Sequence, residues 1–228
     1  MVLRLLAPVL LLLCLASATD SMKLPVPLPA VRAAAQAAAA KLAGRPLVLG
    51  STSSTRRALL AALDVPHRCD APSIDERAVG DRGGDAAALV MAVAHAKADA
   101  LQRSYGAASD VLLLTGDQVV VRGSYPDGAR EILEKPSDLD QCRAFMRAHG
   151  TQGCATVGAC VLTDCRTGQR WDGVDVANIR FSALPDDVVE AMIAKDGNTL
   201  LQCAGGVMIE HDLLQPCVLL LLLLRSLY

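Results

Sequence analysis

Aromatic side chains are scarce in this chain. Of its 228 residues, one is Trp, three are Tyr and two are Phe, so little surface is available on which nucleic-acid bases could stack. The formal net charge of −2 provides no basic field that would attract a phosphate polymer. These two absences argue against a nucleic-acid polymer as the partner.

Paired cysteines and a nucleotide-binding Walker loop are also missing. The chain has eight cysteines but no Cys-x-x-Cys pair, so the usual spacing of a zinc site or a disulfide framework is absent. Reduced, mostly buried thiols are therefore expected, and these favour a reducing compartment. No Gly-Lys-Ser/Thr follows Gly50, which excludes a Walker loop at the first strand end.

No hydrophobic run is long enough to predict a stable membrane span. Leu5–Leu15 is too short, and with Arg4 before it and Ala16–Ala18 after it the segment has the layout of a secretory signal peptide. We expect residues 1–45 to be a leader or linker that is cleaved or disordered. A secretory or organellar destination conflicts with the inference of reduced cysteines, and the sequence leaves both open.

The order of apolar patterns predicts an α/β fold. Leu47–Leu49 is typical of a short buried strand, and a helix with Leu59, Leu60 and Leu63 on one stripe follows. Val111–Val121 is apolar at both ends, which indicates a central strand covered on both faces. The remaining patterns predict strands near 154–163 and 171–181, and helices beginning after Asp85 (to about Arg103), after Ser137 (to about His149) and at Pro185 (to Gly197).

The loop after the first strand is a candidate anion site. Ser51, Thr52, Ser53 and Ser54 precede a helix N-terminus, where free backbone N–H groups and the helix dipole favour negative charge. Arg56 shares the face of the buried leucines, and an arginine there favours a carboxylate or phosphate partner. A capped helix with solvated arginines is the alternative.

Two charged residues occupy positions that are otherwise apolar. Lys97 lies on the stripe of Val93 and Leu101, where it either extends to the rim or meets an anionic partner. Asp117 follows Gly116 inside the central strand and requires a cation, a metal or hydrogen bonds, unless it only caps a loop. We expect this strand to end or bend near Gly116. The loop Ser73–Glu76 is expected to place two carboxylates together.

Six motifs occur in one order along the chain, and together they resemble the Maf family of nucleoside triphosphate pyrophosphatases. The resemblance covers about residues 46–212. The motifs are Ser-Thr-Ser-x-x-Arg-Arg57, Ile-Asp-Glu76, Ala-His-Ala-Lys97-Ala, Thr-Gly-Asp117-Gln-Val-Val, Glu-Lys135-Pro and Cys203-Ala-Gly-Gly.

The resemblance implies a Maf-type, ITPase-like domain over residues 46–216, with a two-lobed mixed sheet flanked by helices around a central cleft. It implies hydrolysis of a nucleoside triphosphate to monophosphate and pyrophosphate in the cytoplasm, with a divalent cation, usually Mg²⁺ with Mn²⁺ as an alternative. A homodimer is compatible with it. The catalytic residues would be Asp117, Lys97, Lys135 and Arg56, with Ser51 on the phosphates and Glu76 beside Asp117 on the metal.

Base selection in the family is attributed to three positions, matched here by Thr55, Gln118 and Glu210. The last two are shared with the bacterial branch that acts on 7-methyl-GTP, and the eukaryotic branch is similar. A carboxylate suits a methylated guanine, whose ring is positively charged. Thr55 departs from that branch, which has a tryptophan able to stack on the base. A dTTP/UTP pyrophosphatase and a weakly active nucleotide-binding regulator of cell division are the alternatives.

The resemblance stops near the end of the chain. After Pro216 the family continues through a Gly-containing segment, a further strand edge and a terminal helix, whereas this chain has the apolar run Val218–Leu224. We expect residues 217–228 to form an atypical apolar tail, and the family's last segment to be missing.

Overall fold

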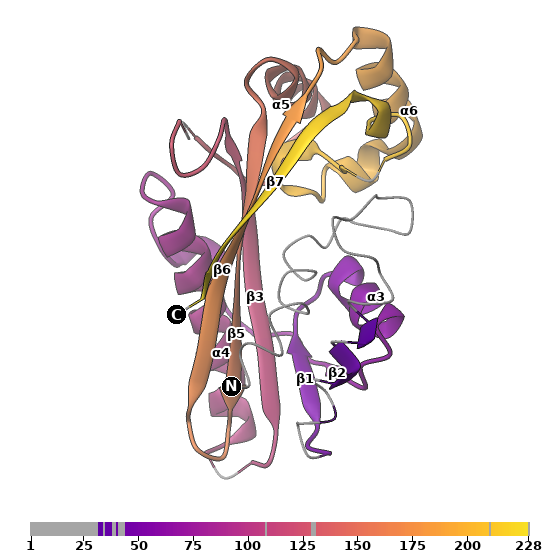
Figure 1. Cartoon of the computed structure of the whole chain (residues 1–228). Coiled ribbons are helices and arrows are strands. Elements are labelled where there is room, and N and C mark those ends of the chain that lie inside the picture. The colour runs from indigo at the N-terminus through magenta and orange to yellow at the C-terminus, as the bar shows by residue number, and fades with distance from the viewer. Residues whose placement is uncertain are drawn as a thin grey trace.

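The computed structural model describes residues 32–33, 35–37, 40, 44–107, 109–128, 131–209 and 211–227 (Figure 1). Element labels follow Figure 1, with η for 3₁₀ helices. The elements are β1 (Leu47–Gly50), α3 (Ser54–Ala62), β2 (Arg68–Cys69), η1 (Glu76–Ala78), α4 (Ala86–Tyr105), β3 (Leu112–Arg122), β4 (Ile132–Leu133), α5 (Leu139–Gln152), β5 (Cys154–Asp164), β6 (Arg170–Phe181), α6 (Asp186–Leu200), η2 (Ala204–Gly206), η3 (Gln215–Cys217) and β7 (Val218–Leu227).

The strands form one seven-stranded mixed sheet in the order β2-β1-β3-β5-β6-β7, with β4 also paired to β3. β2, β1 and β3 run parallel to one another, whereas the ladder from β3 through β5 and β6 to β7 is antiparallel. This mixed sheet with helices packed on it confirms the predicted α/β class, and β3 is the central strand as expected.

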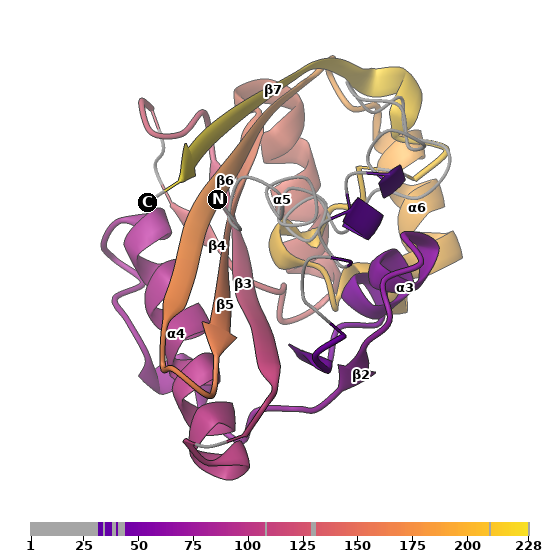
Figure 2. The same cartoon turned by 60° about the horizontal axis from the view of Figure 1, so that its bottom comes forward.

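The two faces of the long strands are covered by different helices. α4 lies on one side, and α3, α5 and α6 lie on the other (Figure 2). Val119 and Val121 of β3 pack with α4 in one apolar cluster, and Val120 packs with α5 and α6 in another. Because side chains alternate along a strand, the odd-numbered residues of β3 face α4 and the even-numbered ones face the opposite layer.

β3 does not end at Gly116. It pairs with β5 in an unbroken antiparallel register from Leu112 to Arg122, so the expected end or bend near Gly116 is wrong. The polar pair after the glycine is tolerated because β5 supplies ladder partners along the whole length. The side chains of Asp117 and Gln118 consequently leave the sheet on opposite faces, with Asp117 on the α4 side.

Helix boundaries were predicted less accurately than helix positions. Asp85 caps α4 as expected, and its carboxylate accepts from Ala88 N at 2.9 Å. The cap of α5 is Asp138 rather than Ser137. α6 continues past Gly197 to Leu200, with a non-helical backbone only at Asp196. Gly197 is buried against Leu139, so tertiary packing carries the helix through a residue that often ends one.

The apolar run near the end of the chain is a strand. β7 pairs antiparallel with β6 over nearly its whole length, from Gly173 opposite Leu227 to Phe181 opposite Val218. It is therefore the last strand of the same sheet, at the edge beyond β6. Leu219 is 68% exposed, as expected for a strand at a sheet edge.

Most of the predicted leader lies outside the described residues; of its described residues, 32–33, 35–37 and 40 are helical. Within the described part of the chain, no helix is both long enough and apolar enough to cross a bilayer. Of the seven described cysteines four are buried, two are half-buried and one, Cys69, is exposed, so the expected burial holds for four of the seven. Burial raises the pKa of the Cys154 thiol to about 12, so it stays protonated at neutral pH.

Candidate active site

The predicted site residues gather along one edge of β3. β5 occupies the other edge throughout, while β1 pairs with β3 only as far as Thr115. β4 takes up the same edge as β1 from Val120 onward. Among the described strands, none pairs with Gly116–Val119 on this side. We call this segment the open edge, and it contains Asp117 and Gln118.

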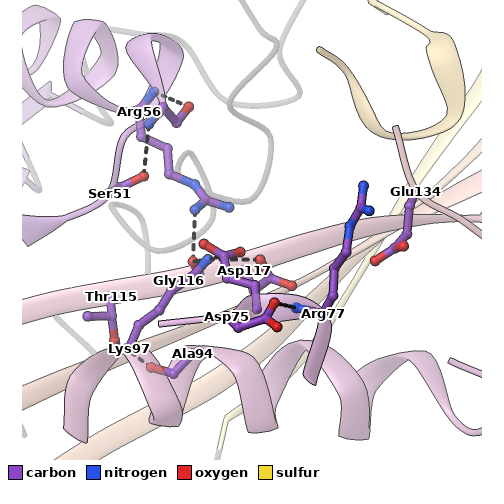
Figure 3. A network of polar contacts seen from close by, with 12 residues as sticks. Ser51, Arg56, Asp75, Arg77, Ala94, Lys97, Thr115, Gly116, Asp117 and Glu134 are labelled. Carbon is purple, nitrogen blue, oxygen red and sulfur yellow. Dashed lines mark hydrogen bonds and ion pairs between the residues drawn. The ribbon is translucent and has the colours of Figure 1, made fainter. Parts of the chain in front are cut away.

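Gly116 is the first residue of the open edge. Its carbonyl oxygen accepts hydrogen bonds from cationic side chains and not from a neighbouring strand among those described (Figure 3). Arg56 Nη1 donates to this oxygen at 2.8 Å, and Lys97 Nζ lies 3.4 Å from it. Close packing requires glycine here, because a Cβ atom would lie 2.7 Å from the carbonyl oxygen of Ala159 in β5. The glycine therefore lets β5 approach closely while its own carbonyl faces two positive side chains.

The packing of α4 on β3 brings Lys97 to Asp117. The hydroxyl of Thr115 donates to the Ala94 carbonyl at 2.8 Å. Lys97 lies one turn further along α4 and Asp117 lies two residues further along the same face of β3, so their side chains meet at 3.1 Å. Nζ of Lys97 also lies 2.8 Å from Oε2 of Glu76. Lys97, 6% exposed, therefore has anionic partners and does not extend to the rim.

The two carboxylates of the Ser73–Glu76 loop separate instead of lying together as expected. Asp75 caps η1, where its Oδ1 accepts from the backbone N of Arg77 at 3.1 Å. Glu76 alone reaches Lys97. Because the short Asp75 side chain caps the first turn of η1, only the longer Glu76 side chain extends toward the open edge. Figure 3 shows the Arg77 side chain extending from this turn on the side of Glu134.

The hydroxyl-rich loop before α3 is ordered by its own hydrogen bonds. Ser53 is the N-cap and accepts from the backbone N of Arg56 at 3.3 Å. The hydroxyl of Ser51, in a residue only 8% exposed, accepts from Ser53 N at 3.2 Å. The helix is thus capped, as in the simpler alternative, but Arg56 turns to the open edge and not to solvent. Thr55, in the first turn, is exposed.

The remaining predicted site residues are Lys135, Gln118 and Glu210. Lys135 is exposed and follows β4, in which Leu133 pairs with Val120. Continuing that antiparallel register by two residues would bring Lys135 opposite Gln118, although none of the described ion pairs joins Lys135 to Asp117. Gln118 is half-buried on the face opposite Asp117. Glu210 lies outside the described residues.

The Cys203–Gly206 motif is hydrogen-bonded to Glu134, the residue that follows β4. Gly205 N donates to the Glu134 carbonyl oxygen at 2.9 Å. Glycine is required at this position because φ is +67° and a Cβ atom would lie 2.7 Å from the Val120 side chain. The Gly205 carbonyl lies 2.9 Å from Nε2 of His149. Burial lowers the pKa of His149 to about 4, so the ring is neutral at physiological pH and Nε2–H donates this bond.

One residue of this region was missed by sequence reasoning. Arg82, in the loop between η1 and α4, donates to the carbonyl oxygens of Val79 at 2.6 Å and of Glu76 at 2.8 Å. Its Nε lies 3.3 Å from Oε1 of Glu134. No periodicity or motif marks this arginine, because its three acceptors come together only in the folded chain.

Glu76 and Asp117 are suited to a hard divalent cation. Each directs one oxygen at Lys97 Nζ, while their second oxygens accept no hydrogen bond from the described residues. The described part of the chain contains no cluster of three or more His, Cys, Asp or Glu side chains that could hold a metal alone. Mg²⁺ commonly binds through one or two carboxylates and completes its shell with water and substrate phosphates, which this pair fits.

Known proteins are similar to this chain over most of its length. The family model described as Maf-like protein matches residues 46–218. A 7-methyl-GTP pyrophosphatase of Dictyostelium discoideum is 30% identical over 175 residues, which cover 75% of this chain and 84% of the relative. One of Thiobacillus denitrificans is 36% identical over 168 residues, covering 72% and 75%. A dTTP/UTP pyrophosphatase of Chlamydia caviae is 27% identical over 177 residues, covering 75% and 84%.

Proposed function

This chain belongs to the Maf-like protein family, and from that premise we propose that it is a nucleoside triphosphate pyrophosphatase. It hydrolyses a nucleoside triphosphate to the monophosphate and pyrophosphate. Relatives with related activities in their names, for 7-methyl-GTP in two cases and for dTTP and UTP in a third, support the reaction class.

The arrangement of Asp117, Lys97 and Glu76 at the open edge carries this proposal. Water attacks a phosphorus atom, the bond to the leaving phosphate oxygen breaks, and the water proton must go to a base. Asp117 accepts that proton and orients the water, because one of its oxygens is held by Lys97 at 3.1 Å and the other is available. Positioned proton acceptors of this kind contribute about 10²–10⁴-fold to rate.

The positive side chains bind the phosphates and offset the charge that develops on them. Lys97 and Arg56 converge on the carbonyl of Gly116, and Lys135 follows β4 at the other end of the open edge. Ser51 contributes a hydroxyl beside the N-terminus of α3, where backbone N–H groups favour an anion. A divalent cation, when bound by Glu76 and Asp117, would supply further positive charge for the phosphate oxygens.

The base preference is assigned to Gln118, on the other face of β3, and to Glu210. Gln118 points away from Asp117, so the base and the reacting phosphate would lie on different sides of this strand segment. Gln118 and Glu210 offer hydrogen-bond acceptors to a guanine edge, and the negative charge of Glu210 favours the cationic ring of 7-methylguanine. We therefore assign 7-methyl-GTP as the preferred substrate, with dTTP and UTP as the alternative that Thr55 leaves open.

The test is a substrate panel. The purified full chain is incubated with Mg²⁺ and with 7-methyl-GTP, GTP, dTTP, UTP, CTP or ATP, and the release of pyrophosphate and monophosphate is measured. We expect the highest kcat/KM with 7-methyl-GTP. Release of inorganic phosphate without pyrophosphate would contradict the reaction, and a preference for dTTP would contradict the base assignment alone. No turnover on any member would favour a nucleotide-binding regulator.

Two further assignments rest on the family. We take residues 46–216 as the catalytic domain, and β7 extends its sheet beyond this boundary. We also take the cytoplasm as the compartment, as the resemblance implies. Fractionation of cells that express the full chain tests the compartment.

A further inference from the structure

Arg82 connects the η1 turn, which carries Glu76, to Glu134, which follows β4. Its Nη1 and Nη2 donate to Val79 O at 2.6 Å and Glu76 O at 2.8 Å, within the η1 turn. Its Nε is paired with Glu134 at 3.3 Å. Glu134 directly precedes Lys135, whereas η1 carries the glutamate that reaches Lys97. The two segments are thereby connected by a single guanidinium.

We propose that Arg82 is a positioning residue for the proposed reaction, which sets the distance between the Glu76 turn and the Lys135 segment. This inference rests on the proposed function, because it assigns Glu76 and Lys135 to one substrate. Arg82 acts through these residues and need not touch the nucleotide.

The need for such a residue follows from the local structure. η1 is only three residues long and has no buried residue, and its C-cap Val79 is only partly buried against the apolar cluster of α4, so apolar packing holds the turn at one end. Loops with few buried contacts open locally at low free-energy cost. Bonds from a charged donor to two carbonyl oxygens of the same turn are stronger than neutral ones and limit that opening. The Glu76 carboxylate then stays where Lys97 can meet it.

Arginine is required because of its geometry. A planar guanidinium with five donors in a fixed fork can serve three acceptors that lie in different directions. A lysine ammonium keeps the charge but cannot hold the same three acceptors from one rigid plane. The substitution Arg82→Lys therefore separates geometry from charge, since a role in attracting the anionic substrate would survive it.

A matched control exists elsewhere in the chain. Arg143 is paired with Glu190 between α5 and α6, and the side chains of this pair are 28% and 48% exposed. Those of Arg82 and Glu134 are 29% and 47% exposed. The two ion pairs thus share chemistry and exposure, and only the Arg82 pair adjoins the open edge.

The experiment compares the full chain with Arg82→Ala, Arg82→Lys and Arg143→Ala. Pyrophosphate release gives kcat and KM on the best triphosphate, and hydrogen exchange followed by mass spectrometry gives backbone opening over residues 73–84. We expect both Arg82 variants to lose about tenfold in kcat with less than a threefold change in KM. We also expect faster exchange over 73–84 in both, and Arg143→Ala to match the wild type in all three measurements.

Several results would overturn this inference. These are wild-type kcat and exchange in Arg82→Ala, recovery of both in Arg82→Lys, or an equal loss in Arg143→Ala. Should Arg82→Ala not fold, Glu134→Ala breaks only one of the three contacts and is expected to lower kcat by a smaller factor. A wild-type chain without pyrophosphatase activity would refute the proposed function, and the exchange comparison would still decide whether Arg82 holds the turn.

Discussion

Two aspartates of the sheet, Asp164 and Asp117, are each paired with a cation, and their surroundings differ. Asp164, at the end of β5, receives two hydrogen bonds from Arg45, at 2.7 and 2.9 Å. The backbone N–H of Arg166 donates a further one at 2.9 Å. Asp117, in the middle of β3, has Lys97 on one oxygen at 3.1 Å and shares that lysine with Glu76.

The difference separates a structural carboxylate from one available for chemistry. The hydrogen bonds from Arg45 hold the pKa of Asp164 well below its usual range, and both oxygens are occupied, so it can neither bind a ligand nor accept a proton near neutral pH. Asp117 keeps one oxygen without a described partner, and its side chain is 18% exposed. An ion pair alone therefore does not mark a functional residue; an incomplete set of partners does.

The largest expected effect comes from Asp117→Asn, which keeps the volume and removes the charge and the basicity. We expect kcat for the best triphosphate to fall by about 10³-fold, within the range for a lost general base, and the chain to stay folded, because Lys97 keeps Glu76 as an anionic partner. Steady-state kinetics and a thermal melt measure both. A variant with near wild-type kcat would make Asp117 structural, like Asp164.

Asp164→Asn should show the opposite pattern, with lower stability and unchanged kcat in the folded fraction. Removing one partner of a mostly buried pair costs about 3 kcal/mol of unfolding free energy at neutral pH. The folded-state pKa of Asp164 is depressed, so its stabilisation is fully present above the unfolded pKa of about 4 and is lost progressively as the pH falls from there through the folded-state pKa. The wild-type and variant stabilities should therefore converge in acid.

Urea unfolding at several pH values measures this convergence. The control is Asp110→Asn, because Asp110 also pairs with Arg45 but its side chain is 61% exposed. We expect that variant to lose less than about 1 kcal/mol. An equal loss in both variants would show that burial of Asp164 is not the cause.

Lys135→Ala should lower kcat/KM by about 10² for every triphosphate tested, as expected when a donor to developing charge is removed. The ratio between bases should stay the same, since the phosphates are common to all substrates. Lys195→Ala, an exposed lysine on α6, is the control and should behave as wild type. A loss confined to one base would move Lys135 from the phosphates to the base pocket.

The smallest effect is expected for Glu210→Gln, which keeps size and removes charge. Replacing a charged acceptor by a neutral one should lower kcat/KM for 7-methyl-GTP by about tenfold and leave UTP and dTTP within about twofold. The same panel of triphosphates measures it. Equal losses on all three substrates would refute the role of Glu210 in base selection without affecting the reaction class.

Much of the fold was readable from periodicity. The stripe that includes Val93, Lys97 and Leu101 predicted α4, and it is buried against β3. Boundaries were less predictable, because Ser137 and Asp138 are both good caps and only the folded backbone selects Asp138. Gly197 failed to end α6 for a related reason, since its burial against Leu139 is a tertiary contact.

The candidate site was predictable where a residue type conflicts with its surroundings. Lys97 on an apolar stripe and Asp117 in an apolar strand both indicated a missing partner, and each proved to be a partner of the other. Arg82 carried no such conflict, because an arginine in a glycine-rich loop is ordinary. Its importance depends on three acceptors that only folding brings within reach.

The sequence by itself determined the alternation of buried residues, the residues able to carry charge and the motifs that mark the family. Only the tertiary structure decided that Gly116–Val119 would be an open edge. Neither Asp117 nor Gln118 encodes it, because it depends on β1 ending at Gly50 and on β4 joining at Val120. Strand pairing connects segments distant in sequence, so where a strand lacks a partner depends on the ends of other strands.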